Sequence, residues 1–166
     1  LTLITTGSYV PGNVSRHHLS TFYRPWDEVQ HEKFDGFIVT GAPVETMPFE
    51  SVKYWDELRR IFDWTQTNVN STLNICWGAQ ASLKHFHGVE KYELPEKMFG
   101  VFEHRVEVPT SAILRGFCDR VMIPVSRHTE TRRTDLEAVD GITILLDSDE
   151  AGFCMAEDAP RRQIYM

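Results

Sequence analysis

The chain has 166 residues, of which 42% are hydrophobic and 25% are charged, and this length and composition are typical of one globular domain. It carries 17 Lys and Arg against 24 Asp and Glu, a formal net charge of −7, which argues against nucleic acid or an anionic membrane as a partner. No run of about 18 apolar residues predicts a membrane span, and no signal-peptide profile is present, so we expect a cytoplasmic protein.

The first half of the chain alternates short apolar runs with helical patterns, as in βα units that build a parallel sheet. The pattern predicts strands at residues 1–5, 37–39 and 71–76. It predicts a weak helix at 18–28 and helices at 49–67 and 77–84 between and after them. A tight loop at residues 40–43 follows the second strand. Cys76 lies at the corner where the third strand turns sharply into a helix.

The second half of the chain reads mainly as β-structure. Strands are expected at residues 99–108, 121–125, 141–146, 152–156 and 163–166. No internal repeat or linker divides the chain, so we predict one domain over residues 1–166. Its predicted fold is a three-layer α/β architecture, a mostly parallel sheet flanked by helices.

Cys76 is the sharpest chemical feature of the sequence. A nucleophile at a strand-to-helix corner has its side chain pushed clear of the sheet, and the helix N-terminus stabilises a thiolate. The backbone N–H groups of Trp77 and of Ala42, in the loop after the second strand, are candidate donors for an oxyanion hole. The alternative is a buried structural thiol, which is our interpretation of Cys118 and Cys154.

A cysteine nucleophile needs a base, and the chain has seven histidines. His104 and His128 lie beside other polar residues where strands end, and spacing alone assigns neither of them to the site. Lys97 and Arg127 are candidate anchors for a substrate carboxylate. The three cysteines form no CxxC pair and no histidine pair has metal-ligand spacing, so we expect neither a disulfide framework nor a metal site.

Four separated motifs carry a family resemblance. They are Gly-Ala-Pro-Val-Glu at residues 41–45, Ser-Thr-Leu-Asn-Ile-Cys-Trp-Gly-Ala-Gln-Ala at 71–81, Pro-Glu-Lys-Met-Phe-Gly-Val-Phe-Glu-His at 95–104 and Ser-Arg-His-Thr-Glu at 126–130. In this order they resemble the homoserine O-acyltransferases of methionine biosynthesis, the homoserine transsuccinylase family. The resemblance implies a class I glutamine amidotransferase-like, flavodoxin-like fold.

The resemblance also implies roles for individual residues. Cys76 matches the nucleophile that carries the acyl group as a thioester. Lys97 matches a substrate-binding lysine that would pair with the amino-acid carboxylate, and Ser126 matches a position linked to substrate specificity. Glu45 occupies the position where glutamate accompanies acetyl-CoA and glycine accompanies succinyl-CoA. Acetyl-CoA is therefore the expected co-substrate. The resemblance as a whole implies small-molecule substrates, no bound cofactor and a homodimeric assembly.

Other functions stay open beside homoserine O-acetyltransferase. L-Serine could replace L-homoserine as acceptor, succinyl-CoA could be the donor, and the same cysteine could serve an amidotransferase-like hydrolase or a ligand-binding scaffold without turnover. In the family, a catalytic histidine and glutamate follow the strand that matches residues 163–166. We therefore expect a chain truncated at both ends relative to the family and inactive by itself, unless His104 or His128 is recruited as the base.

Overall fold

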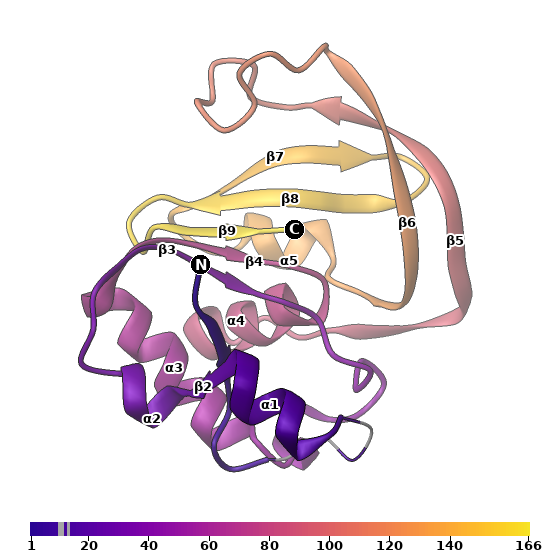
Figure 1. Ribbon diagram of the computed structural model, residues 1–166. Coiled ribbons are helices and arrows are strands. Elements are labelled where there is room, and N and C mark those ends of the chain that lie inside the picture. The colour runs from indigo at the N-terminus through magenta and orange to yellow at the C-terminus, as the bar shows by residue number, and fades with distance from the viewer. Residues whose placement is uncertain (10–11, 13) are drawn as a thin grey trace.

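The computed structural model describes residues 1–9, 12 and 14–166 and has a curled sheet above a layer of helices (Figure 1). The main sheet has seven strands in the order β3-β4-β9-β8-β7-β5-β6. Its strands are β3 (Phe34–Val39), β4 (Val69–Asn74), β5 (Tyr92–Val106), β6 (Arg120–Glu130), β7 (Ile142–Ser148), β8 (Gly152–Asp158) and β9 (Gln163–Tyr165). Two further strands, β1 (Leu3–Thr5) and β2 (Tyr23–Pro25), pair with each other in parallel.

The helices largely follow the predicted positions. They are α1 (Arg16–Phe22), α2 (Trp26–Val29), the 3-10 helix η1 (Phe49–Ser51), α3 (Trp55–Asn68), α4 (Trp77–His87) and α5 (Arg133–Glu137). The weak helical segment expected at 18–28, interrupted by Pro25, forms two short helices, because Pro25 favours extended backbone before it and β2 separates α1 from α2. None of the helices in the described ranges is long and apolar enough to cross a membrane.

The prediction of a mostly parallel sheet is wrong. β4 pairs in parallel with β3 and with β9, whereas the pairs β9–β8, β8–β7, β7–β5 and β5–β6 are antiparallel. The connections at residues 149–151 and 159–162 explain the difference, because a parallel crossover needs a dozen or more residues. The sheet is therefore mixed, and the long β5–β6 hairpin curls it into a half-barrel (Figure 1).

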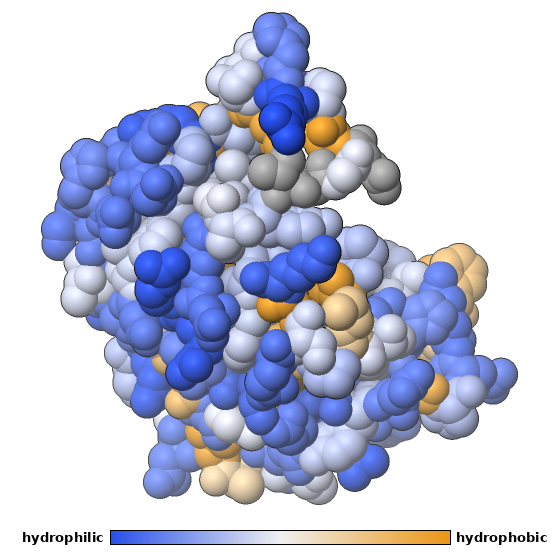
Figure 2. Space-filling view, turned by 90° about the horizontal axis from the view of Figure 1, so that it is seen from below, coloured by the Kyte–Doolittle hydropathy of each residue, from blue (hydrophilic) through white to orange (hydrophobic). Residues whose placement is uncertain are grey.

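Separate apolar cores lie on the two faces of the sheet. On one face α3 and α4 pack against β3 through side chains such as Phe62, Trp77 and Val39, and α5 joins the same layer through Leu136. On the other face Leu145 and its neighbours pack under the connection at residues 107–119. The predicted layers of helices on both faces are thus replaced by one helical layer and a curled sheet. Seen from the helix side, the surface is mainly hydrophilic (Figure 2).

Candidate active site

Cys76 occupies a strained turn between β4 and α4. It is the N-cap of α4, with φ 58° and ψ −127°, a backbone conformation that residues with a Cβ rarely adopt. Its N–H donates to the carbonyl oxygen of Met166 (2.6 Å), and the N–H of Ile75 donates to that of Val39 (2.8 Å). The turn is thereby fixed to β3 and to the end of β9, and its thiol is exposed. The predicted strand-to-helix corner at Cys76 is confirmed.

Gly78 allows α4 to start close to the end of β3. A Cβ at this position would lie 2.9 Å from the carbonyl oxygens of both Val39 and Thr40, closer than side chains tolerate. Any other residue would push the first turn of the helix away from the strand. The glycine two positions after the cysteine therefore keeps Cys76 at the end of the sheet.

The loop after β3 lies directly against the thiol. A Cβ at Gly41 would stand 3.2 Å from Cys76 Sγ and 3.5 Å from the backbone nitrogen of Trp77. The carbonyl oxygen of Ala42 accepts from the Val44 N–H (2.7 Å), which tightens this loop. The structure thus brings Cys76, the Trp77 N–H and the loop of Ala42 together, as the sequence predicts.

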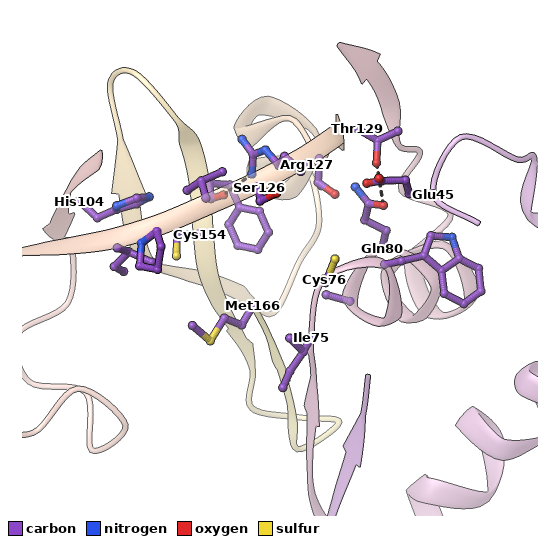
Figure 3. A pocket seen from close by; sticks show the side chains of 17 residues that line it. Glu45, Ile75, Cys76, Gln80, His104, Ser126, Arg127, Thr129, Cys154 and Met166 are labelled. Carbon is purple, nitrogen blue, oxygen red and sulfur yellow. Dashed lines mark hydrogen bonds between the residues drawn. The ribbon is translucent and has the colours of Figure 1, made fainter. Parts of the chain in front are cut away.

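Cys76 opens into a cavity of about 210 Å³ (Figure 3). Its walls come from the start of α4, from β6, from β8 and from the loop that carries Glu45. The Glu45 carboxylate accepts from the backbone N–H of His128 (3.3 Å). The Thr129 hydroxyl donates to Gln80 Oε1 (3.1 Å). Polar side chains from three separate segments therefore line the cavity into which the thiol opens.

The other predicted residues divide between the cavity and its surroundings. Ser126 and Arg127, on β6, line the cavity. Lys97 is exposed in the irregular part of β5, where its ammonium lies 5.5 Å from the centre of the Phe99 ring, and it is not part of the lining. The side chain of His128 is likewise exposed and outside the lining, although its backbone N–H contacts Glu45.

His104 lies at the end of the cavity away from Cys76 (Figure 3). It is 1% exposed, its Nδ1 lies 3.0 Å from the carbonyl oxygen of Phe102, and its Nε2 has no partner among the described residues. Because a carbonyl can only accept, Nδ1 carries the proton and Nε2 of the neutral ring is an acceptor. His104 can accept a hydrogen bond in the cavity, but Figure 3 shows it well separated from the thiol.

Burial governs the electrostatics of the cavity. It lowers the pKa of Arg127, an effect that the negative charge of Glu130 and nearby thiolates oppose. It raises the pKa of Cys154, and Arg127 opposes that rise. Charge is therefore costly on this side of the cavity. Within the described ranges, no group of three or more His, Cys, Asp or Glu could hold a metal ion.

Sequence reasoning missed several residues of the lining, among them Gln80, Thr129 and Cys154. Cys154 was expected to be a buried structural thiol, yet it is partly exposed in the cavity, and Cys118, given the same interpretation, is exposed. Gln80 lies one helical turn after Cys76, so a helix beginning at Trp77 predicts that it faces the same side. Cys154 had no comparable signal, because its place depends on the curl of the sheet.

A family model described as "HTS: Homoserine O-succinyltransferase" matches residues 1–166. The curated relatives include proteins named homoserine O-acetyltransferase from Allorhizobium ampelinum (53% identical), Agrobacterium fabrum (53%) and Brucella canis (52%), over 166 residues that make up 100% of this chain and 54% of each relative. The chain spans about half the length of the curated relatives it matches.

Solved structures give the fold. A protein from Thermoplasma acidophilum, described as part of a GMP synthase, aligns with TM-score 0.64 and 17% identity, over 99% of this chain and 81% of that chain. The glutaminase domain of Trypanosoma brucei CTPS, with bound acivicin, aligns with TM-score 0.56 and 12% identity, over 76% of this chain and 59% of that chain. The chain therefore has a mixed α/β fold of the class I glutamine amidotransferase-like kind.

Proposed function

Because the chain belongs to the homoserine O-succinyltransferase family, we propose that the protein transfers an acetyl group from acetyl-CoA to the side-chain hydroxyl of L-homoserine, a step of methionine biosynthesis. The observation that carries the proposal is the exposed thiol of Cys76 on a strained turn at the N-terminus of α4, open to a cavity. Such a turn presents a nucleophile together with backbone N–H groups.

The reaction proceeds in two half-reactions through Cys76. The thiolate attacks the carbonyl carbon of acetyl-CoA, the bond to the CoA sulfur breaks, CoA leaves as a thiolate that takes up a proton, and the acetyl group remains on Sγ. The hydroxyl oxygen of homoserine then attacks the same carbon, gives its proton to a base, and Sγ leaves as the thiolate. In the family that base is a histidine paired with a glutamate, so the assays below use the full-length protein.

Each half-reaction places a negative charge on the former carbonyl oxygen. The N–H of Trp77, the first residue of α4, lies beside the loop of Ala42, and both flank Sγ. We propose that the Trp77 and Ala42 N–H groups donate to this oxygen. A single preorganised donor of this kind contributes about 10²–10³-fold to the rate.

Glu45 is the proposed selector of the acyl donor. Its carboxylate lines the cavity of Cys76 and is oriented by the His128 N–H. A succinyl group ends in a carboxylate, which Glu45 would repel in a confined cavity, whereas an acetyl group has neither the charge nor the length. Acetyl-CoA is therefore the proposed donor.

Acceptor binding is assigned to Ser126 and Lys97. We propose that Ser126, in the lining of β6, contacts the hydroxyl amino acid, and that Lys97 contacts it from outside the lining. Both roles rest on the resemblance to the family. We propose further that the protein needs no bound cofactor and acts as a homodimer. Light scattering on the full-length protein tests the dimer.

A steady-state comparison tests the proposed function. The full-length protein is assayed with L-homoserine and with L-serine, each with acetyl-CoA and with succinyl-CoA. Acetyl-CoA with homoserine should give by far the highest kcat/KM, and Cys76→Ala should abolish turnover while Cys118→Ala, at an exposed thiol outside the cavity lining, keeps it. Preference for serine, preference for succinyl-CoA, or glutamine hydrolysis without CoA would each contradict the proposal.

A further inference from the structure

Arg127 brings a positive charge into the wall of the cavity and forms no direct ion pair among the described residues, although the charge of Glu130 acts on it. Its Nη1 donates to the carbonyl oxygen of Phe153 (3.3 Å) and its Nη2 to that of Ala151. Its Nε is buried and has no hydrogen-bond partner in the described part of the chain. Two backbone carbonyls therefore fix the guanidinium in place, and neither of them carries a charge that would neutralise it.

Neighbouring arginines are neutralised by carboxylates. Arg105 pairs with Asp149 (2.7 Å), and Arg133 pairs with Asp147 (2.7 Å). Arg120, on the same strand as Arg127, pairs with Glu103. Among the described residues these arginines thus form direct ion pairs, whereas Arg127 forms none and feels the charge of Glu130 only through space.

The cavity limits the size of an anion that Arg127 could meet. Its volume is about 210 Å³, below the roughly 300–1,000 Å³ of sites for larger ligands. It suits a small carboxylic acid better than the phosphates of a nucleotide. Glu45, the carboxylate in the lining, accepts from the His128 N–H and forms no ion pair with Arg127.

We propose that Arg127 is the subsite that binds the carboxylate of a small acid next to Cys76. Guanidinium groups match carboxylates in shape and charge, and each Nη nitrogen keeps a second hydrogen for the ligand. Under the proposed function that acid is the hydroxyl amino acid. Only the identity of the acid rests on the proposed function; the binding of a carboxylate by Arg127 does not. The carboxylate contact that the resemblance gives to Lys97 is thereby assigned to Arg127, because Lys97 lies outside the cavity lining.

The test compares alkylation of Cys76 by anionic iodoacetate and by neutral iodoacetamide, at low ionic strength in the full-length protein, with peptide mass spectrometry to confirm the site. Both reagents react with the same thiolate, so the ratio of their rates reports anion binding beside it and cancels changes in thiol reactivity. Arg127→Gln should lower the ratio about three- to tenfold. Arg120→Gln, which removes the same charge outside the cavity, should change it less than twofold.

An unchanged ratio in Arg127→Gln would overturn the proposal, because a guanidinium that only clamps β6 to β8 affects both reagents alike. If this variant fails to fold, the unmodified protein gives a second measurement. L-Homoserine should protect Cys76 from iodoacetamide at concentrations about tenfold lower than L-homoserine amide, which lacks the carboxylate. Equal protection by both would contradict the subsite. A protein with this discrimination but no acetyl transfer would refute the proposed function and leave the subsite standing.

Discussion

The backbone strain at Cys76 gives a quantitative prediction about stability. At φ 58° and ψ −127° a residue with a Cβ costs about 1–3 kcal/mol, whereas glycine adopts this region without that cost. Glycine in turn lowers the free energy of unfolding by about 0.4–1 kcal/mol relative to alanine, because it gives the unfolded chain more conformational freedom. Cys76→Gly should therefore be more stable than Cys76→Ala by about 0.5–2 kcal/mol, although both variants lack the nucleophile.

Urea unfolding of the full-length variants, followed by tryptophan fluorescence, measures this difference. The control is Arg59, exposed within α3, where Arg59→Gly should be less stable than Arg59→Ala by about 1 kcal/mol. The order of the two substitutions should thus reverse between the positions. If Cys76→Gly is less stable than Cys76→Ala, and the slope of the free energy of unfolding against urea concentration is the same in both, the account of a strained turn is refuted.

Glu45→Gly should raise kcat/KM for succinyl-CoA relative to acetyl-CoA by at least tenfold in steady-state assays, because the repelling carboxylate is removed, and an unchanged donor preference would contradict charge exclusion. Gly78→Ala should destabilise the fold by about 1–3 kcal/mol in urea unfolding, since its Cβ would meet two carbonyl oxygens; a loss below about 0.5 kcal/mol would show that α4 can shift freely. Burial lowers the pKa of His87, and Asp158 opposes this effect. Below about pH 6.5 the folded state therefore binds fewer protons than the unfolded state. The stabilisation present above that pH is lost as the pH falls towards the pKa of His87 in the folded state. His87→Gln should show a smaller loss of urea midpoint between pH 7.5 and 5.5 than the unmodified protein, and equal losses would be inconsistent with this linkage.

The local elements of the fold were predictable because their signals are local. The helical spacing around Leu58 and Phe62 identifies α3, and the small residues after Cys76 identify α4. Strand direction was predicted wrongly, since alternation of apolar residues is the same in parallel and antiparallel strands. The short connection at 149–151 did contain the missing signal, because it cannot return the chain to a parallel strand.

The candidate site was predictable where it depends on the turn at Cys76. The contact of Gly41 and Ala42 with that turn follows from neighbouring parallel strands that end at the same edge of the sheet. Cys154 could not be found in this way. It reaches the cavity only because β5 to β8 curl, and the bulges that produce such a curl leave no distinct pattern in the sequence.

The central claim is that Cys76 carries the acetyl group, and mass spectrometry tests it most directly. The full-length protein is incubated with acetyl-CoA without an amino acid, quenched in acid and digested. We predict an added acetyl group on the peptide of Cys76, absent from the peptides of Cys118 and Cys154, and lost when L-homoserine is added before the quench. A folded protein whose Cys76 peptide stays unmodified, or whose acetyl group survives homoserine, would contradict the account.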